Sequence, residues 1–302
     1  VPSIPVGYER QVKMHSLDFE EFLWAIGIGE DSASFVRNFF INREKVPYEV
    51  NEQMLKYLRE YMVVGGMPEV VNEYLKSKHF GLVHDAQQKI MNAYLEDIAK
   101  YASTVDKPKA RNCFLSIPRQ LAKENKKFQF SIVEKGGRAR KYENSLEWLR
   151  DANLITYCRN LTLPQFPLRA YESEDQFKIY INDIGLLISM YGFEMKGAVL
   201  NDSLKGAMKG GIYENLIADM LIKKNKPLYY FKNDNNTQEI EFFITDDDGI
   251  IPIEVKAGNG TSISLNNFLK EQKPKYGYKF INGNVGVVEN KITLPLYMAM
   301  FL

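Results

Sequence analysis

The sequence predicts a multidomain α and α/β protein, with a helical N-terminal part, a winged helix-turn-helix in the middle and a C-terminal α/β domain with a mixed sheet. Three observations support this. Helical patterns surround a glycine-rich turn near residue 65. Patterns of helices followed by two strands occupy residues 89–192. Residues 239–257 have the pattern of a β-hairpin in which apolar and charged residues alternate. The predicted domains are residues 1–88, 89–192 and 193–302.

The N-terminal part carries two helix signals. Ser16 or Asp18 is suited to cap a helix, because acids follow in its first turn. Residues 56–75 read as two helices interrupted at Gly65-Gly66, with Pro68 in the first turn of the second helix. Taken alone, this pattern predicts only a turn.

The middle part has the element order of a winged helix. Helices are expected at residues 109–124 and from Gly137 to about residue 150, with a short helix between them. Strands are expected at residues 154–158 and 176–181. Helix, short helix, turn, helix and a two-stranded wing is a variant of the helix-turn-helix.

A basic cluster at the start of the second of these helices predicts contact with nucleic acid. Arg138, Arg140 and Lys141 are expected to meet phosphates or bases in a DNA major groove. Glu143 and Glu147 dilute the positive charge, so phosphate contact is favoured over sequence readout. The alternative is a winged helix that serves only packing or protein contact.

The C-terminal hairpin carries the residues with the clearest chemistry. Apolar residues alternate with Glu241 on the first strand and with Glu254 and Lys256 on the second, so each strand is expected to have one apolar and one charged face. Two carboxylates on adjacent strands suit Mg²⁺ or Mn²⁺, and a nearby lysine suits metal-assisted phosphodiester hydrolysis. The alternative reading is an ordinary solvated strand face.

This hairpin resembles the catalytic hairpin of the PD-(D/E)XK nuclease superfamily, in which an acid on one strand precedes (D/E)-x-K on the next. Glu241, Glu254 and Lys256 match that pattern, which implies a catalytic role for all three. The resemblance also implies metal ligation by Glu241 and Glu254, and by Glu214, an acid expected near the start of the preceding helix. One departure is Glu241, where the superfamily usually has Asp. The extra methylene is expected to affect catalysis more than metal binding.

Nearly the whole chain resembles the C-terminal region of prokaryotic archaeal-type AAA+ ATPases. The motifs are Gly-Gly-Met-Pro-Glu, the winged helix, Lys-Ile-Tyr-Ile-Asn-Asp-Ile-Gly-Leu-Leu and Pro-Ile-Glu-Val-Lys-Ala. The resemblance implies that Gly66 and Pro68 form a turn of the lid beside the nucleotide. The chain contains no G-x-x-x-x-G-K-[ST], so we expect ATP binding only with a missing N-terminal ATPase core. The chain is accordingly expected to be a fragment that begins after that core.

Composition limits the classes of protein to which the chain can belong. The chain has 302 residues, 45% of them hydrophobic, and a net charge of +1, so the strongly basic signature of many nucleic-acid-binding proteins is absent. No apolar run reaches the length of a membrane span and no secretory signal is recognisable, so a cytoplasmic location and no membrane contact are expected. Cys113 and Cys158 lack CxxC spacing and are expected to be buried thiols. The resemblance to AAA+ ATPases is compatible with an oligomeric protein.

Two functions from different classes follow. The first is a Mg²⁺- or Mn²⁺-dependent DNA nuclease domain, with the winged helix positioning the duplex. The second is an inactive nuclease-like and winged-helix module that recognises DNA or a protein and is coupled to the ATPase. A third, weaker possibility is a winged helix that only holds the lid against the ATPase core.

Overall fold

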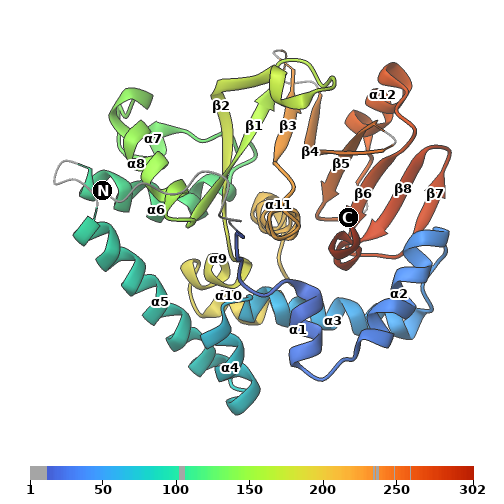
Figure 1. The fold of residues 1–302 in the computed structure, drawn as a ribbon, viewed down its shortest axis with the longest axis horizontal. Coiled ribbons are helices and arrows are strands. Elements are labelled where there is room, and N and C mark those ends of the chain that lie inside the picture. The colour runs from blue at the N-terminus through green and yellow to red at the C-terminus, as the bar shows by residue number, and fades with distance from the viewer. Residues whose placement is uncertain (1–11, 102–105, 234, 236–237, 248, 259) are drawn as a thin grey trace, which may run out of the picture.

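The computed structural model describes residues 12–101, 106–233, 235, 238–247, 249–258 and 260–302, which form a mixed α/β fold around one eight-stranded sheet (Figure 1). This confirms the expected mixed sheet. The strand order is β2-β1-β3-β4-β5-β6-β8-β7. The strands are β1 (Ile155–Leu161), β2 (Glu172–Ile181), β3 (Tyr229–Lys232), β4 (Glu239–Asp246), β5 (Gly249–Lys256), β6 (Gly277–Ile281), β7 (Gly286–Val288) and β8 (Lys291–Pro295). Residue 248 of the predicted turn and residues 1–11 of the predicted first domain lie outside the described residues.

The N-terminal part is helical, as the sequence predicts. The helices are α1 (Phe19–Ala25), α2 (Glu30–Asn42), α3 (Tyr48–Val64), α4 (Pro68–Ser77) and α5 (Phe80–Tyr101). Asp18 is the N-cap of α1, and its side chain forms a reciprocal capping box with Glu21. The predicted turn between α3 and α4 is confirmed, with Pro68 as the first residue of α4.

The middle part contains the predicted elements in the predicted order. The helices are α6 (Lys107–Leu121), α7 (Phe130–Val133) and α8 (Ala139–Asp151), and the strands β1 and β2 follow them. Strand β1 also pairs in parallel with β3, with Arg159 opposite Tyr229. The sheet therefore continues across residue 192, the expected edge between the second and third domains. The division into three domains stays a prediction.

Helices cover both faces of the sheet. The remaining helical elements are η1 (Leu168–Tyr171), α9 (Ile184–Met190), α10 (Glu194–Leu200), α11 (Gly206–Lys223), α12 (Ile263–Gln272) and η2 (Leu296–Phe301). Phe242 packs in the core that contains α11 and η2, whereas its neighbour Phe243 packs in a second core with α12. Both side chains are fully buried. The expectation that β4 has one charged face was therefore wrong, because two layers of helices exclude water from both sides.

Helix α11 runs through the centre of the molecule and is seen end-on in Figure 1. It begins at Gly206, so Glu214 lies more than two turns inside the helix and not near its start as expected. Gly211 sits where α11 crosses the end of α6, and a Cβ there would lie 2.0 Å from the carbonyl oxygen of Leu121. Gly211 thus permits a close helix crossing, and the glycine pair does not mark a helix start.

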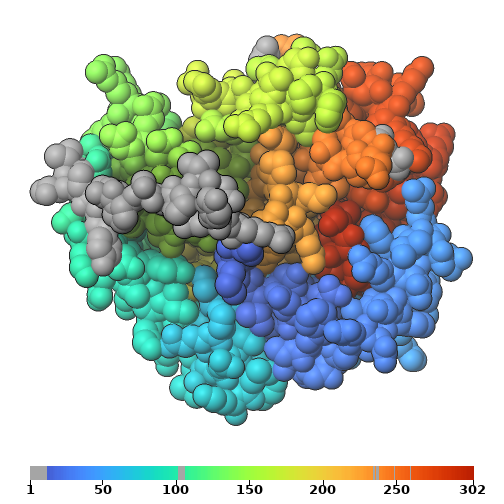
Figure 2. Space-filling model, in the orientation of Figure 1, coloured from blue at the N-terminus to red at the C-terminus, as the bar shows by residue number. Residues whose placement is uncertain are grey.

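Helix α2 of the N-terminal part packs against the C-terminal segment η2. The rings of Phe40 and Phe301 lie 5.6 Å apart. Figure 2 shows the blue N-terminal helices directly against the red C-terminal segment. Among the described residues, no helix combines the length and apolar character needed to cross a membrane.

Candidate active site

The two acids and the lysine of the hairpin lie where β4 and β5 stop pairing. The register of the two strands runs from Asp246 opposite Gly249 to Phe242 opposite Ile253. Beyond that point, the backbone N–H of Val255 lies 3.4 Å from Oε2 of Glu241 and donates to it. A side chain therefore takes the place of a strand partner, and the carboxylate is held at the point where the ladder ends.

Lys256 connects the two carboxylates. Its Nζ lies 3.2 Å from Oε1 of Glu254 and 3.8 Å from Oε1 of Glu241. The alternation along β5 thus brings Glu254 and Lys256 together, as the sequence predicts. The lysine side chain retains 30% of its exposure, whereas that of Glu254 retains 1%. The ammonium group is consequently the part of this trio that solvent and a ligand can reach.

Burial gives the two carboxylates unusual environments. Burial, against the opposing charge of Lys256, raises the pKa of Glu241 to about 8. Glu254 is fully buried, and neither of its oxygens has a hydrogen-bond partner among the described residues, although Oε1 is ion-paired with Lys256. A buried carboxylate oxygen without a partner is costly, and a bound cation would satisfy it.

The structure places Glu214 beside this trio but commits its carboxylate to other groups. Oε1 lies 2.9 Å from Nζ of Lys126, and Oε2 lies 3.2 Å from both Nζ of Lys178 and the hydroxyl of Tyr180. Although burial acts in the opposite direction, the charges of Lys178 and Lys126 lower the pKa of Glu214. Glu214 is thus a neutralised carboxylate rather than a free ligand.

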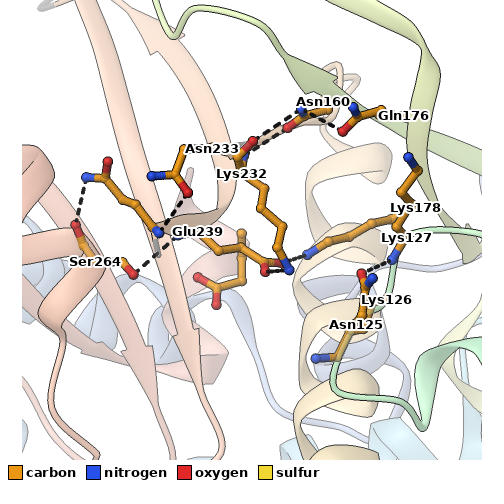
Figure 3. A network of polar contacts seen from close by, with 12 residues as sticks. Asn125, Lys126, Lys127, Asn160, Gln176, Lys178, Lys232, Asn233, Glu239 and Ser264 are labelled. Carbon is orange, nitrogen blue, oxygen red and sulfur yellow. Dashed lines mark hydrogen bonds and ion pairs between the residues drawn. The ribbon is translucent and has the colours of Figure 1, made fainter. Parts of the chain in front are cut away.

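A chain of buried charges continues from Glu214 to the edge of β4. Lys178 also contacts Oε1 of Glu239 at 2.8 Å, and Lys232 contacts Oε2 of Glu239 at 2.8 Å (Figure 3). Burial is outweighed by the charges of Lys178 and Lys232, which together lower the pKa of Glu239 to about 2. Four carboxylates and four lysines therefore share this region: Glu214, Glu239, Glu241 and Glu254 with Lys126, Lys178, Lys232 and Lys256.

Lys126, Lys178 and Glu239 were not predicted from the sequence as residues of the site. A signal existed for Lys178, because it alternates with Phe177 and Ile179 in a strand pattern that is otherwise apolar. A lysine in such a position needs a carboxylate partner when the strand is buried. No comparable signal marks Lys126, since it lies in a polar loop between α6 and α7.

A cavity of about 310 Å³ opens beside Lys256. Its lining comes from the start of α11, the hairpin, the α6–α7 loop and α12: Glu124, Lys126, Gly206, Ala207, Gly210, Glu214, Glu239, Glu241, Val255, Lys256, Ala257 and Ser264. Four segments of the chain thus enclose one polar space. Its size is at the lower end of that of small-molecule sites.

In the described part of the chain, no group of three or more His, Cys, Asp or Glu side chains is arranged to hold a metal ion. The predicted set of Glu214, Glu241 and Glu254 is therefore not assembled as a ready-made site. Mg²⁺ needs only one or two protein carboxylates, because waters and substrate oxygens complete its shell. Glu241 and Glu254 fit that smaller requirement, and Oε2 of Glu254, which has neither a hydrogen bond nor an ion pair to a described residue, supports the fit.

The predicted nucleic-acid contacts lie at the start of α8. Arg138 is the N-cap residue of α8, and Arg138, Arg140 and Lys141 are all exposed. Lys141 is ion-paired with Glu134, so its charge is partly neutralised. The side chains of Glu143 and Glu147 are exposed on the same helix, as expected from the sequence.

The two residues predicted for a nucleotide lid have different environments. Gly66 is buried, its N–H donates to Oδ2 of Asp183, and a Cβ at this position would lie 2.0 Å from the carbonyl oxygen of Leu17. Pro68 begins α4 and is exposed. The turn is thus a packed junction within this chain, and its contact with a nucleotide stays a prediction.

Comparison with known families gives two partial matches. Residues 55–197 match a domain of unknown function, DUF8612, and residues 209–298 match another, DUF4143. Each match covers less than half of the chain. The second domain occurs in proteins associated with AAA ATPases, in outline agreement with the resemblance seen in the sequence. None of the curated proteins or solved structures compared with the chain matches it.

Proposed function

We propose that this protein is a metal-dependent phosphodiesterase that cuts nucleic acid, with the C-terminal part as a PD-(D/E)XK nuclease-like domain. The observation that carries the proposal is the position of Lys256. Its ammonium group lies within 4 Å of Glu241 and Glu254 at the point where their strands stop pairing. That geometry combines two carboxylates with one partly exposed ammonium group beside a cavity.

Glu241 and Glu254 are the proposed ligands of Mg²⁺ or Mn²⁺, which when bound polarises a phosphoryl oxygen and lowers the pKa of a bound water. Glu241 must release its proton to act as a ligand, because burial favours its protonated form. Lys256 then orients the attacking water or neutralises charge that develops on the phosphate oxygens. Glu214 is left out of this ligand set, because two lysines already neutralise it.

The middle part is proposed to be a winged helix that positions the nucleic acid. Arg138 and Arg140 project from the start of α8 without an ion pair to any described residue, which suits them to phosphate contact. We also propose that the chain works beside an ATPase core, with the turn at Gly66 and Pro68 close to the nucleotide. The match of residues 209–298 to a domain found with AAA ATPases supports this association.

The test is cleavage of supercoiled plasmid and of single-stranded DNA with Mg²⁺ or Mn²⁺. Lys256→Ala and Glu254→Gln should each reduce the rate by about 10²-fold or more, because each removes charge needed in the transition state. Lys275→Ala, a lysine outside the cavity lining, is a suitable control and should cut as the wild type does. Cutting that survives both active-site substitutions would come from a contaminant and would refute the proposal.

A second candidate is a catalytically inactive module that recognises DNA or a protein for the ATPase. Two observations favour it: the described residues hold no metal site of three acidic or imidazole ligands, and Glu214 is neutralised by lysines. This candidate predicts DNA binding that depends on Arg138 and Arg140, with no cleavage under any metal. The cleavage assay and a binding assay on the same preparation distinguish the two functions.

A further inference from the structure

The cavity beside Lys256 has a second lysine on its wall, and that lysine comes from the helical middle part. Lys126 lies in the loop of residues 122–129 between α6 and α7, and its side chain retains 11% of its exposure. Its ion-pair partner is Oε1 of Glu214, at 2.9 Å. Lys126 and Lys256 are the only cations among the described residues that line this cavity.

The loop is fixed in place close to Lys126. The backbone N–H of Phe128 donates to the carbonyl of Phe177 on β2 at 2.8 Å. The backbone N–H of Gln129 donates to the side chain of Gln120 at 3.1 Å, and the side chain of Gln120 donates back to the carbonyl of Gln129 at 3.0 Å. Lys126 is therefore presented to the cavity by an anchored loop and not by a free one.

Lys126 is the member of the buried charge cluster that can change partners. Lys178 is only 1% exposed and binds both Glu214 and Glu239, so it cannot turn to a new anion without leaving two carboxylates. When Lys126 leaves Glu214, Oε1 loses its ion-pair partner, but Lys178 and the hydroxyl of Tyr180 still contact Oε2 of the same carboxylate. The ammonium group of Lys126 can thus turn to a new anion while Glu214 keeps the charge compensation of Lys178.

The surroundings of Lys126 suit a phosphate. Gly210 faces the ammonium group, because a Cβ at this position would lie 3.9 Å from Nζ of Lys126. As a glycine, it leaves the space beside the ammonium group without a side chain. The first turn of α11, at Gly206 and Ala207, lines the same cavity and has no side-chain cap. Independently, Oε2 of the buried Glu254 has neither a hydrogen bond nor an ion pair to a described residue, which marks the position beside it as one for a cation that would accompany the phosphate.

We propose that Lys126 binds a phosphate group of the nucleic-acid backbone in this cavity, so that the α6–α7 loop is part of the active site. This inference rests on the proposed phosphodiesterase function. It gives the middle part of the chain a direct contact with the substrate at the reacting position. Substrate binding then exchanges the Lys126 contact with Glu214 for a contact with phosphate.

The experiment uses a fluorescent single-stranded oligonucleotide, with affinity measured by anisotropy in Ca²⁺ and cleavage measured in Mg²⁺. Lys126→Gln keeps a hydrogen-bond donor for Glu214 but loses the charge. It should weaken binding and raise KM about tenfold, the effect of one lost charge-assisted hydrogen bond. Lys126→Arg should restore most of the affinity. Lys127→Ala, which changes the next residue in the loop, is the control and should match the wild type, because Lys127 is not among the described residues that line the cavity.

The outcomes separate this inference from the proposed function. Metal-dependent cleavage with equal KM and affinity for Lys126→Gln and wild type would refute the role of Lys126 and leave the nuclease standing. Binding that depends on Lys126 without any cleavage would support the phosphate contact and refute hydrolysis. Loss of affinity in Lys127→Ala equal to that in Lys126→Gln would also refute the inference, because the effect would then be one of loop charge.

Discussion

The backbone N–H of Gly66 donates a hydrogen bond of 2.8 Å to Oδ2 of Asp183, across 117 residues of sequence. The same carboxylate accepts from the hydroxyl of Ser16 at 3.1 Å and from the backbone N–H of Leu186 at 3.0 Å, which caps α9. Asp183 therefore joins the α3–α4 turn, the N-terminal segment and α9. Two of the motifs that suggested an ATPase relative are thus direct neighbours in the fold.

Asp183→Ala should lower the free energy of unfolding by about 3 kcal/mol, because buried donors lose a charged acceptor and α9 loses its N-cap. Urea denaturation measures the change. Asp175→Ala is the control, since Asp175 is exposed on β2 and should change stability by less than about 0.5 kcal/mol. Equal stability of Asp183→Ala and wild type would show that the junction contributes nothing.

Gly66→Ala should destabilise the protein by about 2 kcal/mol or more. The added Cβ would lie 2.0 Å from the carbonyl oxygen of Leu17, so backbone would have to move. Gly197→Ala is the matched control, because nothing lies within 4 Å of the new Cβ and the position is inside α10. That control should raise the melting temperature slightly, since alanine is the better helix former. A Gly66→Ala protein that melts with the wild type would contradict the close packing.

Glu241→Asp should reduce metal-dependent cleavage by about 10- to 100-fold. The shorter side chain moves the carboxylate away from the N–H of Val255 and from Lys256, which lie 3.4 Å and 3.8 Å from it in the wild type. Single-turnover rates at saturating Mg²⁺ measure the effect. An increase in rate would mean that the natural glutamate is a degenerate form of an aspartate site.

The buried Lys196 should make stability depend on pH in the alkaline range. Burial lowers the pKa of Lys196 to about 8, and its ammonium group donates to the carbonyl of Val63 at 3.1 Å and to the side chain of Gln87. Between pH 8 and 10.5 the unfolded chain binds more protons than the folded one, so the free energy of unfolding rises with pH in that window.

The full effect of Lys196 is on the order of 3 kcal/mol, because each unit of pKa shift corresponds to about 1.4 kcal/mol. Urea denaturation between pH 7 and pH 10 tests it against Lys196→Met, which should lack the positive slope. Parallel pH profiles for wild type and Lys196→Met would contradict the lowered pKa.

Much of the local structure was predictable because it depends on short-range signals. Asp18 with its acids, the Gly65-Gly66 turn before Pro68, and the alternation around Glu254 each act within a few residues, and each appears where expected. The start of α11 was misplaced, because Gly210 and Gly211 read as a helix boundary in the sequence. Gly211 instead permits the close contact of α11 with Leu121, which is more than 80 residues away in the sequence.

The sequence by itself determined α1, the turn between α3 and α4, the helices α6 to α8, the hairpin and the pairing of Glu254 with Lys256, because these depend on caps, turn residues and the period of each element. Only the tertiary structure decided that β1 joins β3, that helices cover both faces of β4, and that Lys126 and Lys178 neutralise Glu214. These features depend on which distant segments meet. Ion pairing and burial depend on these long-range contacts, and the spacing of residues within one element does not determine them.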